Sequence, residues 1–338
     1  METIVNHHVV RSAGSAVREP HEWSPEEVDA ALRDAFAERR PATVDGLGRV
    51  QRYARIPPGK PVRPLLTVWS ALAVGGRLDH VLPVAVGSEA AHTAGLVHDG
   101  DGIRRSRPAV PLALGAEPAV IAGNALLIEF LGALVRVADR GVPPQAVLET
   151  MRIAAEAGAA ARRGAYDELA LAGRLDCPVE TYLAMAHGKT AVFTRAACES
   201  GAVLGGADPE QAAALAAFGE RYGMAFQIRD DMLAHRTGDA ASKNGRPAVS
   251  DLRNRRPTLP LLLAYQRGNG QQRRTLRRAL TRRAPSLQQV HQILHDTGAL
   301  ARARHMADQY WIRARQALDR LPQSRARAEL AAMPLPAP

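Results

Sequence analysis

Residues 208–233, DPEQAAALAAFGERYGMAFQIRDDML, decide the fold, because their composition is helical and their two ends carry distinct signals. Asp208 suits the helix N-cap, Pro209 the first helical position and Gln211 the capping box. The alanine-rich interior favours helix, since alanine loses little conformational freedom there. At the far end Asp230 and Asp231 follow apolar residues, so two adjacent carboxylates end a largely apolar helix.

The same helical pattern recurs along the chain. Residues 24–39 begin with Ser24 as N-cap, Pro25, and Glu27 at the capping-box position. No segment sustains the polar–apolar alternation of a strand, and the breaks between helices carry glycine, proline or aspartate. Further helices are expected at residues 63–75, 82–98, 117–139, 143–172, 180–204, 258–267, 286–296 and 299–320.

Residues 119–138, AVIAGNALLIEFLGALVRVA, are apolar on most sides, which is typical of a helix in the middle of a large bundle. No change of composition marks a domain boundary. The sequence therefore predicts an all-α, single-domain helical bundle over residues 23–338, after a disordered arm over residues 1–22. The arm lacks the apolar stretch of a secretion signal. No apolar run reaches the ~18 residues that span a bilayer, so we expect a cytoplasmic protein without a transmembrane segment.

The formal charge of +10 at pH 7, from 44 Lys plus Arg against 34 Asp plus Glu, fits an anionic partner. Much of the excess lies in residues 267–285, RGNGQQRRTLRRALTRRAP, which we interpret as a solvated helix face. No aromatic residues interleave with these arginines, so a surface that stacks bases is not expected. Nucleic-acid binding would rest on net charge alone, and no nucleic-acid partner is predicted.

Polar clusters interrupt the apolar helices or their connections. They are PPGKPVRPLL (57–66), HTAGLVHDGDGIRRSRP (92–108), HGKTAVF (187–193) and FQIRDDML (226–233), the last followed by GRPAVSDLRNRRPTLP (245–260). The adjacent Asp230 and Asp231 repel each other, and a shared cation would remove that cost. Magnesium needs only a few carboxylates when phosphate oxygens and waters complete its shell. The clusters predict a magnesium–diphosphate pocket; the alternative is a solvated acidic pair ending a helix.

From about residue 40 to about residue 333 the chain resembles the trans-polyprenyl diphosphate synthases of the isoprenoid synthase fold. GKPVRP (59–64) is similar to the family's GKxxRP, HTAGLVHD (92–99) to the approach to its first aspartate-rich motif, and RRSRPAV (104–110) to the arginine segment after it. The resemblance continues in order through HGKTAVFTRAACESGAVLGGA (187–207), FGERYGMAFQIRDDML (218–233), GRPAVSDLRNRRPTLPLLLA (245–264) and TGALARARHMADQYWIRARQAL (297–318).

This resemblance implies a helical bundle with a central cavity, usually paired as a homodimer. It also implies isoprenoid diphosphate substrates and magnesium as the cofactor. An allylic diphosphate bound by magnesium ionises to a stabilised cation, the double bond of isopentenyl diphosphate attacks it, and a proton is lost. The protein's part is to stabilise the leaving diphosphate, align the substrates and exclude water.

The resemblance further implies a role for each matching residue. The diphosphate of isopentenyl diphosphate is held by Lys60, Arg63, His92 and Arg105, with Arg104 close by. The allylic diphosphate is gripped by Lys189, Arg246 and Arg256. Lys189 is also a candidate catalytic residue, together with Thr190 and Gln227 at polar positions that line the site, and the metal-binding aspartates are Asp99, Asp230 and Asp231. Without the resemblance, His92 would be interpreted as a histidine of the core.

The first aspartate-rich motif departs from the family pattern. Asp99 is followed by Gly100 in place of a second aspartate, and the connection from Asp99 to Arg104 is shorter than usual. Asp101 is a candidate for the missing metal ligand, because Gly100 and Gly102 permit unusual backbone angles. Asp101 could instead match an acidic residue late in the usual spacer.

The second motif is also reduced, since Ala234 stands where the family has a third aspartate. On a continuing helix Ala234 would lie one turn after Asp230, on the same face. The isopentenyl side of the pattern is therefore nearly intact, whereas the metal side is weakened in both motifs.

Three functions fit this pattern. We favour a prenyltransferase that condenses an allylic diphosphate with isopentenyl diphosphate, with geranylgeranyl diphosphate as the favoured product. The altered aspartates leave open a terpene cyclase, or an atypical prenyltransferase with another acceptor. Loss of metal ligands around an intact core leaves open a non-catalytic partner subunit of an active synthase.

Product length is expected to depend on Ala94, five places before Asp99, and on the adjacent Gly95. In the family an aromatic residue at the first of these positions closes the tunnel that holds the growing chain. Ala94 and Gly95 would leave that tunnel open to at least one more isoprene unit. The alternative is that the two small residues let neighbouring helices approach closely.

Overall fold

The computed structural model describes residues 22–39, 46–55, 61–99, 103–104, 107–233, 235, 250–281 and 286–336. Helices dominate these ranges, so the predicted all-α fold is confirmed. The α-helices are α1 (Pro25–Glu38), α2 (Gly46–Ala54), α3 (Val62–Ala73), α4 (Leu78–Asp99), α5 (Val110–Leu114), α6 (Ala116–Ala138), α7 (Pro144–Ala170), α8 (Val179–Ala186), α9 (Val192–Leu204), α10 (Pro209–Leu233), α11 (Ser250–Arg253), α12 (Leu259–Arg267), α13 (Gly270–Ala279), α14 (Leu287–Asp296), α15 (Ala299–Ala317) and α16 (Arg325–Ala331).

The described residues also form a π-helical turn, a 3₁₀ turn and a pair of short strands. The π-helical turn η1 (His187–Ala191) joins α8 to α9, and the 3₁₀ turn η3 (Leu318–Arg320) follows α15. The strands β1 (Ile103–Arg104) and β2 (Arg107–Pro108) pair antiparallel between α4 and α5. The predicted N-terminal arm lies outside the described residues up to residue 21.

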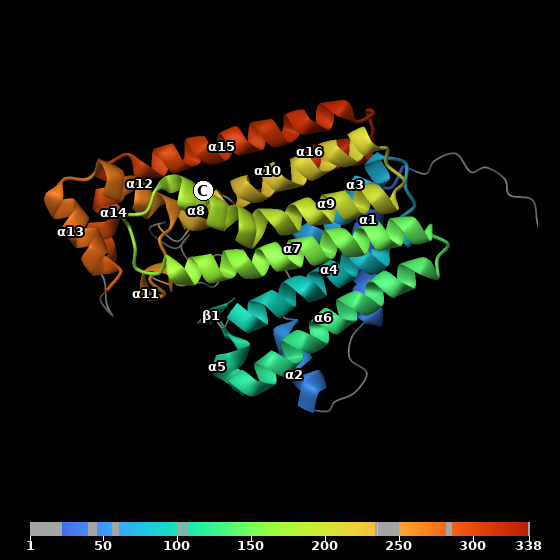
Figure 1. Ribbon diagram of the computed structural model, residues 1–338. Coiled ribbons are helices and arrows are strands. Elements are labelled where there is room, and N and C mark those ends of the chain that lie inside the picture. The colour runs from blue at the N-terminus through green and yellow to red at the C-terminus, as the bar shows by residue number, and fades with distance from the viewer. Residues whose placement is uncertain are drawn as a thin grey trace, which may run out of the picture.

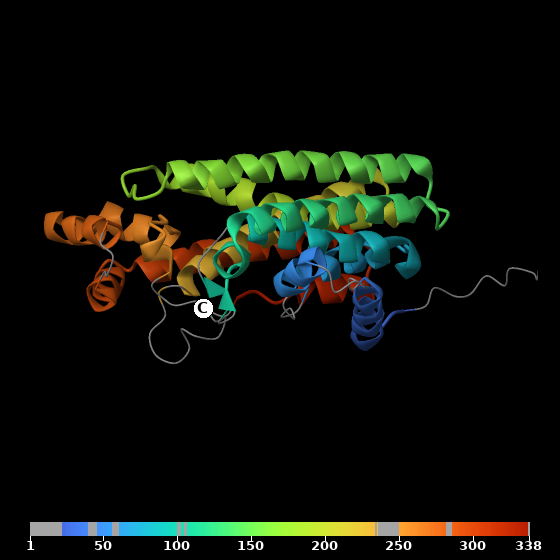
Figure 2. The same cartoon turned by 90° about the horizontal axis from the view of Figure 1, so that it is seen from below.

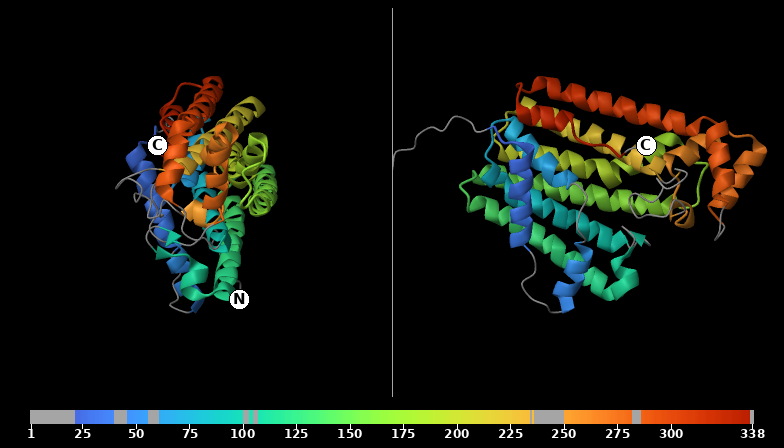
Figure 3. Two further views of the ribbon diagram at one scale, coloured as in Figure 1. Left: turned by 90° about the vertical axis from the view of Figure 1, so that its left-hand side faces the viewer. Right: turned by 180° about the vertical axis from the view of Figure 1, so that it is seen from behind.

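The long helices run side by side as a bundle (Figure 1). From the upper to the lower edge of that view they are α15, α10, α9, α7, α4 and α6, and α10 packs against both α15 and α9. Seen from below, α7 lies along one side of the bundle and α1 along the opposite side (Figure 2). From behind, α1 crosses the long helices, and α12, α13 and α14 gather at one end (Figure 3).

The two predicted capping boxes are confirmed. Ser24 Oγ accepts a hydrogen bond from the Glu27 N–H at 3.2 Å, and Glu27 Oε2 accepts one from the Ser24 N–H at 2.7 Å. At α10, Asp208 Oδ1 accepts from the Gln211 N–H at 2.8 Å, and Gln211 Oε1 accepts from the Asp208 N–H at 3.2 Å. Each box satisfies backbone donors that a helix start otherwise leaves unpaired.

Helix α10 runs through two separate core clusters. Its first half belongs to the cluster among α3, α4, α9 and α16, where Phe218 and Tyr222 are fully buried and stack with ring centroids 6.0 Å apart. Its second half, including Met224 and Ile228, belongs to a cluster with α8, α12, α14 and α15. Because both halves are packed, the end of α10 is held rigidly.

Helix α6 contradicts the expectation that residues 119–138 lie in the middle of the bundle. Only 33% of its most apolar 18-residue window is buried, and it lies at the edge of the bundle (Figure 1). One face packs on α4, whereas Ile121, Ile128 and Val135 are 59%, 65% and 63% exposed. Among the described helices α6 also has the length and apolar composition to cross a membrane, a test that many core helices pass. The inner face of α6 therefore belongs to the core, and its outer face is apolar and exposed.

The helix predicted over residues 180–204 is interrupted by η1, which widens it where Lys189 stands. Neighbouring helices press closely on this turn. A Cβ on Gly164 of α7 would lie 2.5 Å from the Lys189 backbone nitrogen, and one on Gly223 of α10 would lie 2.7 Å from Ala191 Cα. Both distances are too short for real side chains, so glycine is required where α7 and α10 meet η1.

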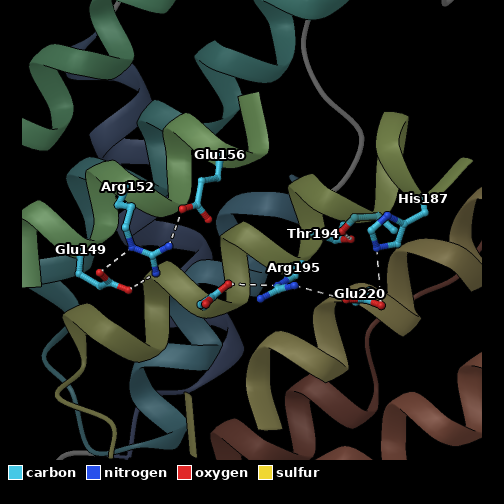
Figure 4. A network of polar contacts seen from close by, with 9 residues as sticks. Glu149, Arg152, Glu156, His187, Thr194, Arg195 and Glu220 are labelled. Atoms are coloured by element: carbon cyan, nitrogen blue, oxygen red, sulfur yellow. Dashed lines mark hydrogen bonds and ion pairs between the residues drawn. The ribbon is translucent and has the colours of Figure 1, made fainter. Parts of the chain in front are cut away.

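Ion pairs hold the outer side of η1 (Figure 4). His187 Nε2 lies 3.6 Å from Glu220 Oε1 of α10, and Arg195 Nη1 of α9 lies 3.7 Å from Glu220 Oε2. The nearby His187 and Arg195 side chains lower the pKa of Glu220. Half-exposed pairs of this kind contribute only about 0–1 kcal/mol each, so close packing is what fixes the turn.

We expect Gly164→Ala to lower the free energy of unfolding by about 1–3 kcal/mol, because the new methyl group collides with backbone atoms of η1. Gly158→Ala is the matched control in the same helix, since a Cβ there meets nothing within 4 Å. It should stabilise the protein by up to ~1 kcal/mol through helix propensity. Urea unfolding of both variants measures the difference, and equal effects would contradict the close contact at Gly164.

Candidate functional site

A cavity of about 510 Å³ opens between α4, α7, α10 and the turn η1. Residues of α2, α3, β2, α5, α8, α9 and α11 and the segment just before α12 also line it. Charged groups line part of the cavity, and apolar side chains such as Met185, Phe193 and Phe226 line the rest. A cavity with both surfaces suits a ligand that has an anionic head and an apolar tail.

Many of the residues predicted for the site line this one cavity. They are Arg63, His92, Lys189, Thr190, Gln227, Asp230, Asp231 and Arg256. They come from α3, α4, η1, α10 and the segment before α12, so the fold gathers side chains that are far apart in the sequence.

The remaining predicted residues divide into two groups. Lys60, Asp101, Arg105 and Arg246 lie outside the described residues, as do Gly100 and Ala234 of the two reduced motifs. Asp99 ends α4 and Arg104 lies in β1, where the structure describes the backbone alone.

Ala94 does not face the cavity. It is 0% exposed and belongs to the core cluster between α4 and α6, with Ala122 and Leu126. The adjacent Gly95 lines the cavity, and a Cβ there would meet only Arg162 Nη1, 4.0 Å away. Successive side chains on a helix point about 100° apart, so one residue packs on α6 while the next faces the cavity. Ala94 thus lies where α4 and α6 pack together, as the second of the two expectations has it, and Gly95 lies in the cavity wall.

Lys189 and Arg256 share one carboxylate in the cavity. Lys189 Nζ donates to Glu168 Oε2 at 2.5 Å, and Arg256 Nη2 lies 3.4 Å from the same oxygen. Arg256 Nη1 also lies 3.8 Å from Asp251 Oδ1. A diphosphate that enters here can replace these carboxylates with phosphate oxygens, which form strong charge-assisted hydrogen bonds with Lys and Arg.

Arg63 belongs to a second basic group, together with His92. The Arg63 guanidinium carbon lies 5.9 Å from the centre of the Phe193 ring. Burial lowers the pKa of Arg63, and the nearby Glu89 opposes this effect. Arg63 Nε has no hydrogen-bond partner among the described residues, and an anionic ligand would supply an acceptor for it.

A chain of hydrogen bonds connects η1 to the acidic end of α10. Thr190 Oγ1 donates to Gln227 Oε1 at 2.6 Å, and Gln227 Nε2 donates to Asp231 Oδ1 at 2.8 Å. Asp231 is 8% exposed, and burial raises its pKa to about 7 even though hydrogen bonds from Tyr182, Leu259 and Gln227 oppose the rise. The negative form of Asp231 is therefore costly until positive charge arrives.

The carboxylates of the cavity suit a hard cation. Asp230 lines the cavity beside Asp231, and both offer oxygen donors of the type that magnesium takes. Within the part of the chain that the structure describes, no group of three or more Asp, Glu, His or Cys side chains forms a metal site by itself. The residues present thus fit a divalent cation that arrives with diphosphate, whose oxygens complete the shell.

Among the cavity residues that were not singled out from the sequence, Glu168, Tyr182 and Asp251 contact the predicted site residues directly. Glu168 lies in a polar stretch of α7, where composition cannot separate a carboxylate that faces a cavity from one that faces solvent. Tyr182 could have been found from its spacing: it stands seven positions, about two helical turns, before Lys189, and residues so spaced lie on the same face of a helix. Asp251 lies in a segment with several charges and no periodicity that would single it out.

The start of α12 is tied to the end of α10 at two points. The Leu259 N–H donates to Asp231 Oδ2 at 3.0 Å, and His235 Nε2 lies 2.9 Å from Thr258 Oγ1. His235 is 4% exposed, and its ring meets the His291 ring edge-on at a centroid distance of 6.5 Å. Burial and the neighbouring His291 lower the pKa of His235 to about 3, so the ring is neutral near pH 7.

Comparison with known proteins gives a consistent result. Residues 45–297 match the family model described as polyprenyl synthetase. A short chain isoprenyl diphosphate synthase of Methanothermobacter thermautotrophicus is 32% identical over 258 residues, which cover 74% of this chain and 76% of the relative. An all-trans-nonaprenyl-diphosphate synthase (geranyl-diphosphate specific) of Rhodobacter capsulatus is 34% identical over 278 residues, covering 80% and 82%.

The fold agrees with these sequence matches. The crystal structure of a polyprenyl synthase from Caulobacter crescentus CB15, complexed with calcium and isoprenyl diphosphate, superposes with a TM-score of 0.82 at 28% identity. The match covers 91% of this chain and 93% of that one. The resemblance found in the sequence motifs is therefore confirmed at the level of family and fold.

The buried His235 predicts how stability depends on pH. Its folded pKa of about 3 lies below the ordinary value of 6.5, so the unfolded chain takes up a proton that the folded chain does not. The folded state should therefore lose about 2 kcal/mol between pH 7.5 and pH 5 through this residue. Burial also lowers the pKa of His291, which adds a loss in the same direction.

We expect His235→Gln to remove this loss: between pH 7.5 and pH 5, its free energy of urea unfolding should rise by about 2 kcal/mol relative to that of wild type, while the raised pKa of Asp231 acts in the opposite direction in both proteins. His295→Gln is the matched control, because the His295 side chain is 85% exposed. It should keep the wild-type slope. A His235→Gln protein with the full wild-type slope would show that His235 is not the group responsible.

Proposed function

The chain belongs to the polyprenyl synthetase family and is a prenyl-transferring enzyme, and we propose that it joins an allylic diphosphate to isopentenyl diphosphate to form a longer prenyl diphosphate. We propose geranylgeranyl diphosphate as the product. The observation that carries the proposal is the convergence of two basic groups and an acidic pair in one cavity with apolar walls.

The basic residues would divide the work between the two substrates. Lys189 and Arg256 can bind the allylic diphosphate and stabilise its charge as the carbon–oxygen bond breaks. Arg63 and His92 can hold the other diphosphate, so that the double bond of isopentenyl diphosphate faces the electron-poor carbon. The apolar side chains of the wall keep water from that carbon, which would otherwise be quenched to an alcohol.

We propose magnesium as the cation that accompanies the allylic diphosphate, with Asp230 among the residues that would hold it. Bound there, a divalent cation would add positive charge at the leaving diphosphate. The oxygen-only donors of the acidic pair support a hard cation, and the solved relative from Caulobacter crescentus contains calcium with isoprenyl diphosphate.

Product analysis of the wild-type chain tests the proposed function. Purified protein and magnesium are incubated with each allylic diphosphate, with and without isopentenyl diphosphate, and the products are identified by mass. A longer prenyl diphosphate that requires isopentenyl diphosphate is the expected result. A hydrocarbon formed from one substrate would mean a cyclase, and no turnover would mean a partner subunit; either result contradicts the proposal.

The exposed face of α5 and α6 supports a homodimer, which we propose as the assembly. Its large apolar residues are at least 40% exposed: Leu112, Leu114, Val120, Ile121, Ile128, Leu131 and Val135. On α6 they recur about every seven residues, which makes one continuous stripe along the helix. A second copy would cover this stripe, and sedimentation velocity of the full chain would contradict the proposal by finding a monomer.

The small residue at position 95 supports a product longer than farnesyl diphosphate, because Gly95 leaves the cavity wall open. The relatives named above range from short-chain to nonaprenyl synthases, so the family alone leaves the length open. The length of the product is then set by the space that the wall residues leave for the prenyl chain, and we propose that this space fits geranylgeranyl diphosphate.

We expect Gly95→Phe to shorten the main product by at least one isoprene unit, because the ring fills space that the growing chain needs. Overfilling a packed tunnel costs about 1–3 kcal/mol, enough to stop an elongation step. Ala94→Phe is the matched control: Ala94 is fully buried against α6, so it should lower the melting temperature without shortening the product. Product mass and thermal unfolding of both variants provide the test, and a stable Gly95→Phe protein with an unchanged product would contradict the wall position.

A further inference from the structure

Asp231 is a hydrogen-bond acceptor for three separate groups. Asp231 Oδ2 accepts from Tyr182 Oη at 2.5 Å and from the Leu259 N–H at 3.0 Å, and Asp231 Oδ1 accepts from Gln227 Nε2 at 2.8 Å. Tyr182 belongs to α8, Leu259 begins α12, and Gln227 lies one turn earlier in α10. Three elements therefore meet at one buried carboxylate.

The Tyr182 hydroxyl is placed to orient this carboxylate permanently. Tyr182 is 1% exposed, and its ring packs in the core cluster that contains Met185 and Ile228. Burial and the adjacent Asp231 raise the pKa of Tyr182 well above its ordinary value, so the hydroxyl keeps its proton. A buried carboxylate needs such donors, since each one that is lost leaves an oxygen unsatisfied.

Asp231 in turn controls two parts of the diphosphate end of the cavity. Its neighbour Asp230 lines the cavity from the same helix turn, so any shift of the α10 end that Asp231 anchors would carry Asp230 with it. The bond to Leu259 fixes the start of α12, directly after the segment that contributes Asp251 and Arg256 to the cavity. The hydroxyl of Tyr182 thus acts on groups that it does not touch.

We propose that Tyr182 is a positioning residue for the diphosphate end of the cavity: its hydrogen bond to Asp231 holds Asp230 and Arg256 in the arrangement that binds a diphosphate together with a divalent cation. This inference rests on the proposed function and deepens it, because it assigns a role to a residue of the cavity wall whose hydroxyl is already donated to Asp231. The three hydrogen bonds to Asp231 come from α8, α10 and α12, whereas Arg63 and His92 stand on α3 and α4.

Two tyrosine variants test the proposal. Tyr182→Phe removes only the hydroxyl that Asp231 accepts from. Tyr222→Phe is the matched control: Tyr222 is also fully buried, and its hydroxyl donates to the Pro334 carbonyl at 2.7 Å, but it does not line the cavity. Both variants lose one buried hydrogen bond, so a general loss of stability affects them alike.

Calorimetry with inorganic pyrophosphate and magnesium gives a readout that does not depend on turnover. We expect Tyr182→Phe to bind magnesium pyrophosphate about tenfold more weakly than wild type, which equals about 1.4 kcal/mol. Tyr222→Phe should bind as wild type does. In the activity assay, Tyr182→Phe should need more magnesium and more allylic diphosphate, with the KM for isopentenyl diphosphate unchanged.

A double-mutant cycle separates positioning from packing. If Tyr182 acts through Asp231, adding Tyr182→Phe to Asp231→Asn should weaken pyrophosphate binding by much less than tenfold. The proposal is overturned if wild type does not bind magnesium pyrophosphate, or if folded Tyr182→Phe binds it as tightly as wild type does. It is also overturned if Tyr182→Phe and Tyr222→Phe weaken this binding equally, or if the effects of Tyr182→Phe and Asp231→Asn on it are additive. If Tyr182→Phe fails to fold, the affinity of Asp231→Asn for magnesium pyrophosphate is compared with that of wild type instead. Equal affinities overturn the proposal.

Failure of the proposed function would look different. A wild-type chain that binds magnesium pyrophosphate but makes no longer prenyl diphosphate would refute the condensation reaction. The calorimetric comparison of Tyr182→Phe with Tyr222→Phe would still decide whether Tyr182 positions the diphosphate end.

Discussion

A carboxylate that is only 8% exposed governs the diphosphate end of the cavity. Burying Asp231 costs free energy unless donors surround it, and the three donors it obtains come from three different elements. The requirement to satisfy one charge therefore fixes α8, α10 and α12 relative to one another. The glycines that let α7 and α10 press on η1 complete this arrangement, because they bring Thr190 close enough to join the same chain of hydrogen bonds.

Two basic residues of the cavity, Lys189 and Arg256, lie beside carboxylates that serve as their counter-ions. Glu168 lies within hydrogen-bond or ion-pair distance of both Lys189 and Arg256, and Asp251 lies near Arg256 as well. A diphosphate that arrives at Lys189 and Arg256 thus exchanges one set of anionic oxygens for another. Such an exchange gains less affinity than binding to unpaired charges, but it leaves no unpaired positive charge at Lys189 and Arg256 when the ligand is absent.

The long helices and their caps could be predicted from the sequence, because those signals are local. Ser24 with Glu27 and Asp208 with Gln211 form the expected boxes, since each pair lies within one turn. The π turn η1 could not be predicted, because nothing in the sequence HGKTA distinguishes a π turn from a continuing α-helix, and the close approach of α7 and α10 is a tertiary feature. The position of α6 also escaped prediction, since apolar residues look alike whether they face a core or a partner.

The candidate site could be located from the sequence, but the direction of its side chains could not. Ala94 and Gly95 are neighbours, yet one packs on α6 and the other faces the cavity, and only the rotation of α4 within the bundle decides between them.

The same limit applies to the acidic pair. Adjacent in the sequence, Asp230 and Asp231 were both expected to bind metal, but Asp231 already accepts three hydrogen bonds, which occupy most of its lone pairs. In the described part of α10, Asp230 is then the carboxylate better placed for a cation. A cation held by few carboxylates must complete its shell with waters and phosphate oxygens, so its affinity for the cavity should rise when diphosphate is bound. With so few carboxylates available, the position of Asp230 at the cavity wall matters more here than it would in a site with a full set of ligands.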